Sequence, residues 1–159
     1  MGPGKETDLV ALRRLLAPGE RLLGLDVGKK TVGVAVSDSA LLLATPVTTI
    51  RRSRLAADAA ALKAFVSERR IGGLVIGLPV GMDGNEGPAC QSVRQFAANI
   101  APVLMLPFAF WDERLSTAAV TRQLIAADAS RAARARVIDS QAAVYILQGA
   151  LDRLAHQVD

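Results

Sequence analysis

The sequence predicts an α/β protein in which helices pack against a mixed five-stranded sheet. Five short apolar runs are bounded by turn-forming residues such as Gly, Pro and Asp, which is typical of strands. The later runs alternate with longer segments in which apolar residues recur every three or four positions, as they do on one face of a helix. Three strands followed by alternating helices and strands indicate a layered architecture, and 159 residues are enough for one domain.

The first three strands are expected early in the chain. Residues 22–27 and 31–37 are apolar on both faces, as in strands inside a covered sheet, and they flank the tight turn Gly28-Lys29-Lys30. This pattern predicts a hairpin. Residues 41–50 are expected to form a third strand. Pro46 favours an edge position or a break there, because proline cannot donate a hydrogen bond to a neighbouring strand.

Helices and strands alternate in the rest of the chain. Ser53 is the expected N-cap of the first long helix, and Pro88 suits the first position of the second. The expected elements are helix 53–70, strand 73–77, a helix from residue 88, strand 103–111 with an early interruption at Pro107, a helix from Ser116 or Thr117 to 127, and helix 138–154. The residues expected to face the core are Leu55, Ala59, Leu62 and Val66, then Val93, Phe96, Ala97 and Ile100, and finally Ala142, Ala143, Ile146, Leu147 and Leu151.

Residues 1–20 are expected to form an N-terminal extension, and residues 21–159 a single domain. The extension contains a short helix over residues 8–16, but it lacks the long apolar core of a secretory signal. No apolar run is long enough to span a bilayer. The single cysteine, Cys90, excludes an internal disulfide and is expected to pack in a helix as a small buried residue. We therefore expect a cytoplasmic protein without membrane association.

Only one histidine, His156, is present, and it lies close to the C-terminus. Catalysis by Ser–His or Cys–His pairs, and zinc binding by histidine, all need a positioned imidazole, whereas a residue near a chain end is usually solvated. Hydrolytic chemistry would therefore depend on carboxylates. The net charge of +4 is compatible with a polyanionic partner but does not establish one.

Three acids occupy positions where apolar residues are the rule. Asp26 ends the first strand, Glu113 follows the strand that ends at Trp111, and Asp139 lies on the same helix face as the inward residues Ala142 and Ala143. Buried like charges repel one another unless a cation offsets them. Ligand sets made only of oxygen suit Mg²⁺ or Mn²⁺, so together the three acids suggest a metal site that acts on phosphodiesters.

Each acid also has a structural explanation. Asp26 could bond backbone amides of the turn near Gly28. Asp139 could favour the start of its helix through the helix dipole. Glu113 could simply pair with Arg114. Its neighbour Asp112 is the alternative metal ligand, because two adjacent residues at a strand end point in different directions.

Several basic residues lie near these acids in the sequence. Such residues usually form a solvated surface, but beside an acidic cluster they would supply positive charge for a nucleic-acid backbone. The loop "GLPVGMDGNEGP" is either a connection between a strand and a helix or a phosphate-binding loop, although Asp83 and Glu86 oppose the second interpretation. Trp111 is expected in the core, with base stacking as the lesser alternative. The candidate nucleic-acid contacts are Lys29, Lys30, Arg114, Arg131, Arg134 and Arg136.

Four segments resemble the signature blocks of the YqgF/RuvX family, which comprises proteins similar to Holliday junction resolvases that are also described as pre-16S rRNA nucleases. The segments are "LGLDVGKKTVGVAVSD", "VIGLPVGMDGNEGP", "DERLST" and "IDSQAAVYILQGALD". The resemblance implies an RNase H-like fold and places Asp26, Glu113 and Asp139 at the family's acidic positions. This sequence departs from the family at Thr31, where many members carry Arg.

What the resemblance implies is a Mg²⁺- or Mn²⁺-dependent phosphodiesterase of the bacterial cytoplasm, most simply one that processes the 5′ end of pre-16S rRNA. Its partner would be structured RNA or branched DNA, and the protein a monomer or homodimer. A Holliday junction resolvase and a non-catalytic RNA-binding factor for ribosome maturation are the alternatives. An actin-like ATPase or sugar kinase shares the Asp-containing hairpin, but such proteins need two copies of the unit and this chain has room for one.

Overall fold

A five-stranded mixed sheet forms the centre of the protein in a computed structural model that describes residues 4–115 and 132–157, with side chains for 4–115 and 141–157. The strand order is β3-β2-β1-β4-β5. Strand β2 is antiparallel to both of its neighbours, β1 and β3, whereas β4 runs parallel to both β1 and β5. The strands are β1 (Arg21–Val27), β2 (Thr31–Ser37), β3 (Ala44–Arg51), β4 (Ile71–Leu78) and β5 (Phe108–Asp112). The predicted fold class is confirmed.

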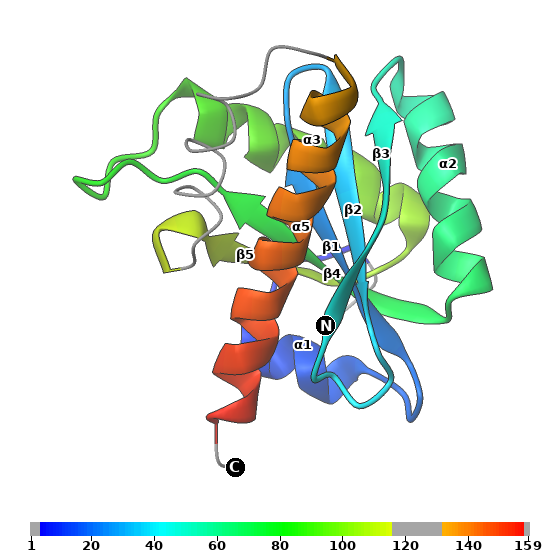
Figure 1. Ribbon diagram of the computed structural model, residues 1–159. Helices are drawn as coiled ribbons and strands as arrows, with labels where there is room; N and C mark the ends of the chain where they lie inside the picture. Colours follow the sequence, from blue (N-terminus) through cyan, green and yellow to red (C-terminus); the bar gives the residue numbers. More distant parts are fainter. Residues whose placement is uncertain (1–3, 116–131, 158–159) are drawn as a thin grey trace.

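Helices cover both faces of this sheet (Figure 1). Helices α2 and α3 pack on one face, and α5 crosses the other, so that two hydrophobic cores lie on opposite sides of the sheet. The helices are α1 (Leu9–Leu15), α2 (Leu55–Glu68), α3 (Pro88–Leu104) and α5 (Ala132–Ala155), and a single 3₁₀ turn, η1 (Glu113–Leu115), follows β5. None of the helices in the described part of the chain is long and apolar enough to cross a membrane.

Alternate residues of β1 divide between the two cores. Leu23 and Leu25 face α2 and α3, whereas Leu22 packs in the core under α5. Gly24 also faces α5, because residues of equal parity on a strand share a side of the sheet. A Cβ atom on Gly24 would lie 2.7 Å from the Cβ of Leu147 and 3.3 Å from the carbonyl oxygen of Ala143. The absence of a side chain therefore lets α5 approach β1 closely.

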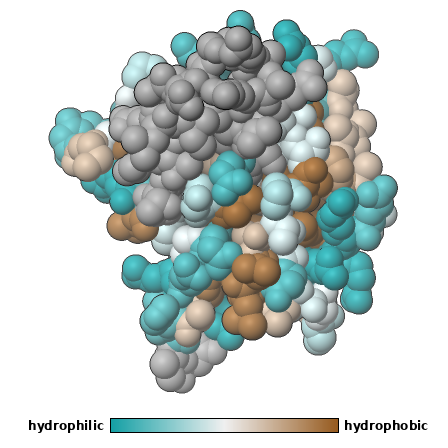
Figure 2. Space-filling view, viewed as in Figure 1, coloured by the Kyte–Doolittle hydropathy of each residue, from teal (hydrophilic) through white to brown (hydrophobic). Residues whose placement is uncertain are grey.

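Helix α5 runs antiparallel to β1. Its C-terminal part lies near the start of β1, where the Gln148 side chain accepts a bond from the Ala44 amide (2.8 Å) and donates to the Leu42 carbonyl (3.0 Å). Its N-terminal turns extend toward the hairpin between β1 and β2, as Figure 1 shows. The start of α5 thus lies at the carboxyl end of β1. On this side of the molecule, small hydrophobic patches alternate with hydrophilic residues on the surface (Figure 2).

The residues predicted to face the core under α3 and α5 are all buried, and Pro88 begins α3 as expected. Strand β3 is an edge strand with an irregular register where Ala35 pairs with Pro46, which confirms the prediction made from that proline. On α2, Ala59 and Leu62 are buried and Val66 is half-buried, but Leu55 is 43% exposed, so its prediction was wrong. The α2 N-cap is Arg54 and not Ser53.

The bounds of several strands and of α5 differ from the prediction: β3 begins at Ala44 and not at residue 41, and β4 spans Ile71–Leu78 and not 73–77. Helix α3 continues to Leu104 with Pro102 inside it, so β5 begins only at Phe108 and not at residue 103. Helix α5 begins at Ala132 and not at 138, because Ala and Arg, which dominate this stretch, are among the strongest helix formers. The helix predicted over residues 116–127 lies outside the described residues.

Residues 4–12 pack against the domain. Leu12 of α1 is fully buried in the core under α5. The Thr7 amide donates to the Phe108 carbonyl (2.8 Å), and the Phe108 amide donates to the Lys5 carbonyl (3.1 Å), so the segment covers the start of the β5 edge. The division into an extension of 20 residues and a domain stays a prediction.

Replacing Gly24 by Ala tests the close approach of α5 to β1. The new methyl group meets backbone and Cβ atoms that cannot rotate away, so the free energy of unfolding should fall by about 1–3 kcal/mol in urea melts. Gly72→Ala on β4 is the matched control, because its methyl group meets the mobile ends of the Glu20 and Leu16 side chains. Equal losses for both variants would contradict this account of the packing.

Candidate functional site

Asp26 lies at the carboxyl end of β1 on the face covered by α5. It shares strand parity with Leu22 and Gly24, and only 7% of its surface is exposed. The hairpin turn beside it is closed by the backbone, since the Gly28 amide donates to the Thr31 carbonyl (2.8 Å). That amide is therefore not the partner of the Asp26 carboxylate. This observation weakens the interpretation of Asp26 as an acid that serves only the turn.

Glu113 is buried on the same face, although it comes from a different strand. It follows β5 in the turn η1 and is 4% exposed. Its Oε2 atom lies 2.9 Å from the position that a Cβ atom would occupy on Gly77, beside the side chain of Ile146 on α5. The carboxylate of Glu113 thus lies over β4, on the side of the sheet that faces α5.

Gly77 of β4 separates the two acids without a side chain of its own. Leu25 pairs with Ile76 across β1 and β4, so the next residues, Asp26 and Gly77, lie side by side at the end of this ladder. Neighbouring strands are ~5 Å apart. The structure therefore buries two predicted site residues, Asp26 and Glu113, on the same face of the sheet near Gly77.

The third predicted acid, Asp139, belongs to α5, but its side chain lies outside what the structure describes. It comes one helical turn before Ala143, whose carbonyl oxygen lies over Gly24. Because α5 begins at Ala132, Asp139 is well beyond the first turn, where the helix dipole acts. The dipole explanation is thus removed, and the convergence of Asp139 with the other acids stays a prediction. Among the described residues, no group of three or more Asp, Glu, His or Cys side chains gathers as a metal site.

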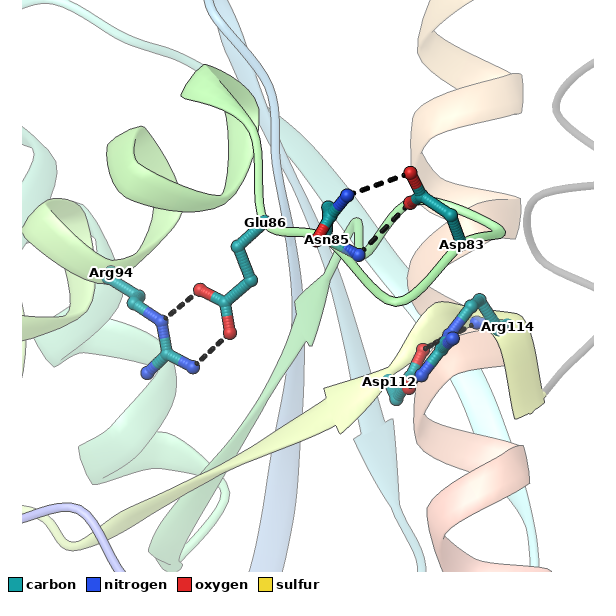
Figure 3. Close-up of polar contacts among 6 residues, drawn as sticks. All are labelled: Asp83, Asn85, Glu86, Arg94, Asp112 and Arg114. Carbon is teal, nitrogen blue, oxygen red and sulfur yellow. Dashed lines mark hydrogen bonds and ion pairs between the residues drawn. The ribbon is translucent and has the colours of Figure 1, made fainter.

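Asp112 pairs with Arg114 instead (Figure 3). The Arg114 Nη2 donates to Asp112 Oδ2 (2.6 Å), and its backbone amide donates to Asp112 Oδ1 (2.9 Å). The guanidinium lowers the pKa of the Asp112 carboxyl, and the carboxylate in turn raises the pKa of Arg114. Asp112 also shares strand parity with Phe108, which packs on the α2–α3 side. Asp112 is thus held by Arg114. Of the two adjacent acids, Asp112 and Glu113, only Glu113 lies beside Gly77.

The glycine-rich loop after β4 is held by its own acids (Figure 3). The Asp83 carboxylate accepts from the amide (3.0 Å) and side chain (2.9 Å) of Asn85, which lowers the pKa of Asp83. Glu86 accepts two bonds from Arg94 (2.7 and 2.8 Å), which lower the pKa of Glu86. Both acids have partners, so they oppose a bound phosphate less than the sequence suggested. A Cβ on Gly84 would be 3.6 Å from Arg114 Nη1, which places the loop beside that guanidinium.

Three of the six basic residues predicted to contact nucleic acid have described side chains, and they lie near the acids. Lys29 and Lys30 are exposed in the hairpin turn, and Arg114 is 35% exposed at the end of β5. Arg131 lies outside the described residues, and Arg134 and Arg136 belong to α5 without described side chains. These last two are thus helical residues and do not precede the helix.

Arg51, the last residue of β3, and Arg52, which follows it, were not among the predicted nucleic-acid contacts. Arg51 pairs with Thr31, and the Arg52 amide donates to the Lys30 carbonyl (2.8 Å). Both arginines therefore lie beside the hairpin turn. The run "RRSR" at the end of a strand expected to join the hairpin was the available signal.

Three other predictions concern single residues. Trp111 is 6% exposed and packs in the core under α5, so the structure contradicts base stacking by this ring, which is not accessible. Cys90 is fully buried in α3, and burial raises the pKa of its thiol. His156 is exposed after the end of α5, with Nδ1 2.7 Å from the Asp152 carbonyl oxygen.

The mixed sheet with this strand order and helices on both faces is an RNase H-like fold. The fold resembles that of Thermus thermophilus RuvC in complex with a Holliday junction substrate, with a TM-score of 0.52 and 13% identity over 85% of this chain and 96% of that one. Residues 20–153 match the family described as "RuvX: Holliday junction resolvase". The chain belongs to the RuvX family, which confirms the resemblance seen in the sequence.

Close relatives support the same assignment. A protein of Paramagnetospirillum magneticum named "Putative pre-16S rRNA nuclease" is 59% identical over 137 residues, which cover 86% of this chain and 88% of the relative. A protein of Rhodopseudomonas palustris with the same name is 61% identical over 138 residues, which cover 87% and 85%. The family match begins at residue 20, so the N-terminal segment lies outside it.

The pairing of Asp112 with Arg114 can be tested by titration. Because Arg114 stabilises the charged carboxylate, NMR should report a pKa for Asp112 below the ordinary value of about 3.9, and Arg114→Ala should return it toward that value. The pair stabilises the fold above the ordinary pKa, and this contribution is lost as the pH falls through the lowered one. An unchanged Asp112 pKa in Arg114→Ala would show that the ion pair is absent in solution.

Proposed function

We propose that this protein is a divalent-metal-dependent nuclease that hydrolyses phosphodiester bonds in structured nucleic acid. The observation that carries the proposal is the burial of Asp26 and Glu113 on the face of the sheet that α5 covers, with the Glu113 carboxylate beside Gly77 of β4, the strand that adjoins β1. Two carboxylates placed so close in a protein interior repel one another, and a cation is the usual compensation.

The residues present fit a hard metal ion. Asp26 and Glu113 supply only carboxylate oxygens, which Mg²⁺ and Mn²⁺ prefer, and Asp139 is the proposed third ligand. When bound, such an ion orients water and stabilises the leaving oxygen of a phosphodiester. Nitrogen and sulfur ligands of the kind that zinc prefers do not contribute among the described residues of this site, since Cys90 is buried in α3 and His156 lies past the end of α5.

The chain itself positions the substrate. Lys29 and Lys30 on the hairpin turn, and Arg114 at the end of β5, place positive charge on either side of the acids and bind the phosphate backbone. The Ile146 side chain of α5 packs over Gly77 beside Glu113, so this helix forms one wall of the proposed site. Because Asp26 and Glu113 come from neighbouring regions of one rigid sheet, their separation is fixed before the substrate arrives.

The proposed substrate is the 5′ end of pre-16S rRNA, processed in the bacterial cytoplasm during ribosome biogenesis. The names of relatives with about 60% identity support this choice. The family description favours branched DNA as a second candidate, whereas the likeness to RuvC, at 13% identity, bears on the fold alone. A purely RNA-binding factor would gain nothing from burying two acids. Cleavage assays with structured RNA and four-way DNA junctions, with Mg²⁺ or Mn²⁺, rank these substrates.

Asp26→Asn separates a catalytic from a structural role. The change removes one buried charge and keeps nearly the same shape, so cleavage should be abolished while the metal-free fold stays as stable or gains about 1 kcal/mol. If Asp26 served only to bond turn amides, its neutralisation would instead cost roughly 1–2 kcal/mol and leave cleavage intact. Thermal melts without metal and one cleavage assay decide between the two. A destabilised variant that still cuts would exclude the catalytic role.

Glu113→Gln and Asp112→Asn form a matched pair at the end of β5. Glu113→Gln should lower the cleavage rate at least 100-fold, because it removes a carboxylate beside Gly77. Asp112→Asn should change it less than tenfold, since this acid is held by Arg114. Single-turnover rates at saturating metal provide the measurement. The reverse order would move the site to Asp112.

A further inference from the structure

A polar groove of about 390 Å³ lies between the start of α2 and one side of α3, away from the face that α5 covers. One wall carries Arg52 and Arg54, from the segment that leads into α2. The other carries Ser92, Gln95 and Asn99, spaced three or four residues apart so that they share one side of α3. Arginine guanidinium groups, amides and hydroxyls are the groups that proteins use to bind phosphates and sugars.

Arg52 is held in a defined position in this groove. Its Nη1 donates to the Gly28 carbonyl (2.7 Å), and its guanidinium carbon lies 5.0 Å from the ring centroid of Phe96. A guanidinium has five N–H donors, and the bond to Gly28 uses one of them. The anchored side chain therefore presents a fixed positive charge at little further cost in side-chain entropy.

A second pocket lies next to the groove, at the hairpin turn that follows Asp26. This pocket, of about 350 Å³, is lined by Val27, Gly28 and Lys29 of the hairpin and by Pro88 and Ser92 at the start of α3, among others. It begins at the residue after Asp26, and it shares Ser92 with the groove. A polymer chain at the acids can thus pass over the hairpin turn into the groove.

One acid, Asp58, also lines the groove. Its Oδ1 accepts from the Ser53 amide (3.1 Å) and hydroxyl (3.5 Å), and the residue is only 6% exposed. Asp58 therefore fixes the segment before α2, and the exposed surface of the groove is set by the arginines and amides.

We propose that this groove is a backbone subsite, which binds phosphates of the substrate strand a few nucleotides from the cleaved bond. Contacts of this kind position a strand without reading its sequence. The identity of the strand rests on the proposed nuclease function, but the groove's preference for a polyanion does not. Arg54 and Gln95 are the best residues for a test, because both are exposed and stand on opposite walls.

The test compares two RNA hairpins that differ only in a single-stranded flank, which is either absent or ten nucleotides long. Binding is measured by fluorescence anisotropy in several salt concentrations and without divalent metal, so that no cleavage occurs. Arg54→Ala and Gln95→Glu should each weaken binding of the flanked hairpin about three- to tenfold. Arg54→Ala should also reduce the slope of log K against log salt by about 0.7. Binding of the hairpin without a flank should not change.

Matched controls lie on the same helices. Lys63→Ala on α2 and Gln91→Glu on α3 make the same charge changes at exposed residues outside the groove, and they should leave binding of both hairpins as in the wild type. Unaltered thermal melts verify the fold of every variant. Equal losses for the two hairpins, losses in the controls, or no loss in Arg54→Ala would overturn the subsite. A wild type that binds the flank but never cuts would overturn the nuclease function and leave the subsite standing.

Discussion

The close packing of α5 on the sheet is the contact on which the rest of the site depends. Gly24 of β1 lies directly under Leu147, and Gly77 of β4 lies under Ile146. At both positions a side chain would push the helix away from the strands. At Gly77 the carboxylate of Glu113 shares this closely packed space with Ile146. A pair of bare positions on adjacent parallel strands thus sets how closely α5 lies on the sheet beside the acids.

Burial strengthens the electrostatic interactions of Asp26 and Glu113, and it also makes their charges costly to the stability of the fold. Asp26 and Glu113 are each less than a tenth exposed, so water screens their mutual repulsion poorly. Two other acids near this edge of the sheet, Asp112 and Glu86, each pair with an arginine. Two acids buried in the interior are a cost that a proposed metal site would justify, in keeping with the common trade of stability for activity.

Much of the fold could be predicted because its signals are local. The hairpin follows from two strands that are apolar on both faces, and the inward faces of α3 and α5 follow from helical spacing. The early start of α5 was missed because the arginines in its first turns were interpreted as a surface for nucleic acid and not as helix formers. The choice between Asp112 and Glu113 required the position of Gly77, which no local pattern contains. Arg52 was missed for a related reason, since its neighbour Gly28 is 24 positions away in the chain.

The order of the elements along the chain has a consequence for synthesis. Asp26 and Glu113 both precede α5, the helix that covers their face of the sheet, in the chain. Until that helix docks, the face of the sheet that carries the two acids remains open to water, and their charges are well hydrated. The environment that we propose for binding a metal is therefore completed only after α5 has been made and has docked. A nascent chain that ends before α5 would carry Asp26 and Glu113 without the enclosure, so the proposed chemistry is withheld until this helix is in place.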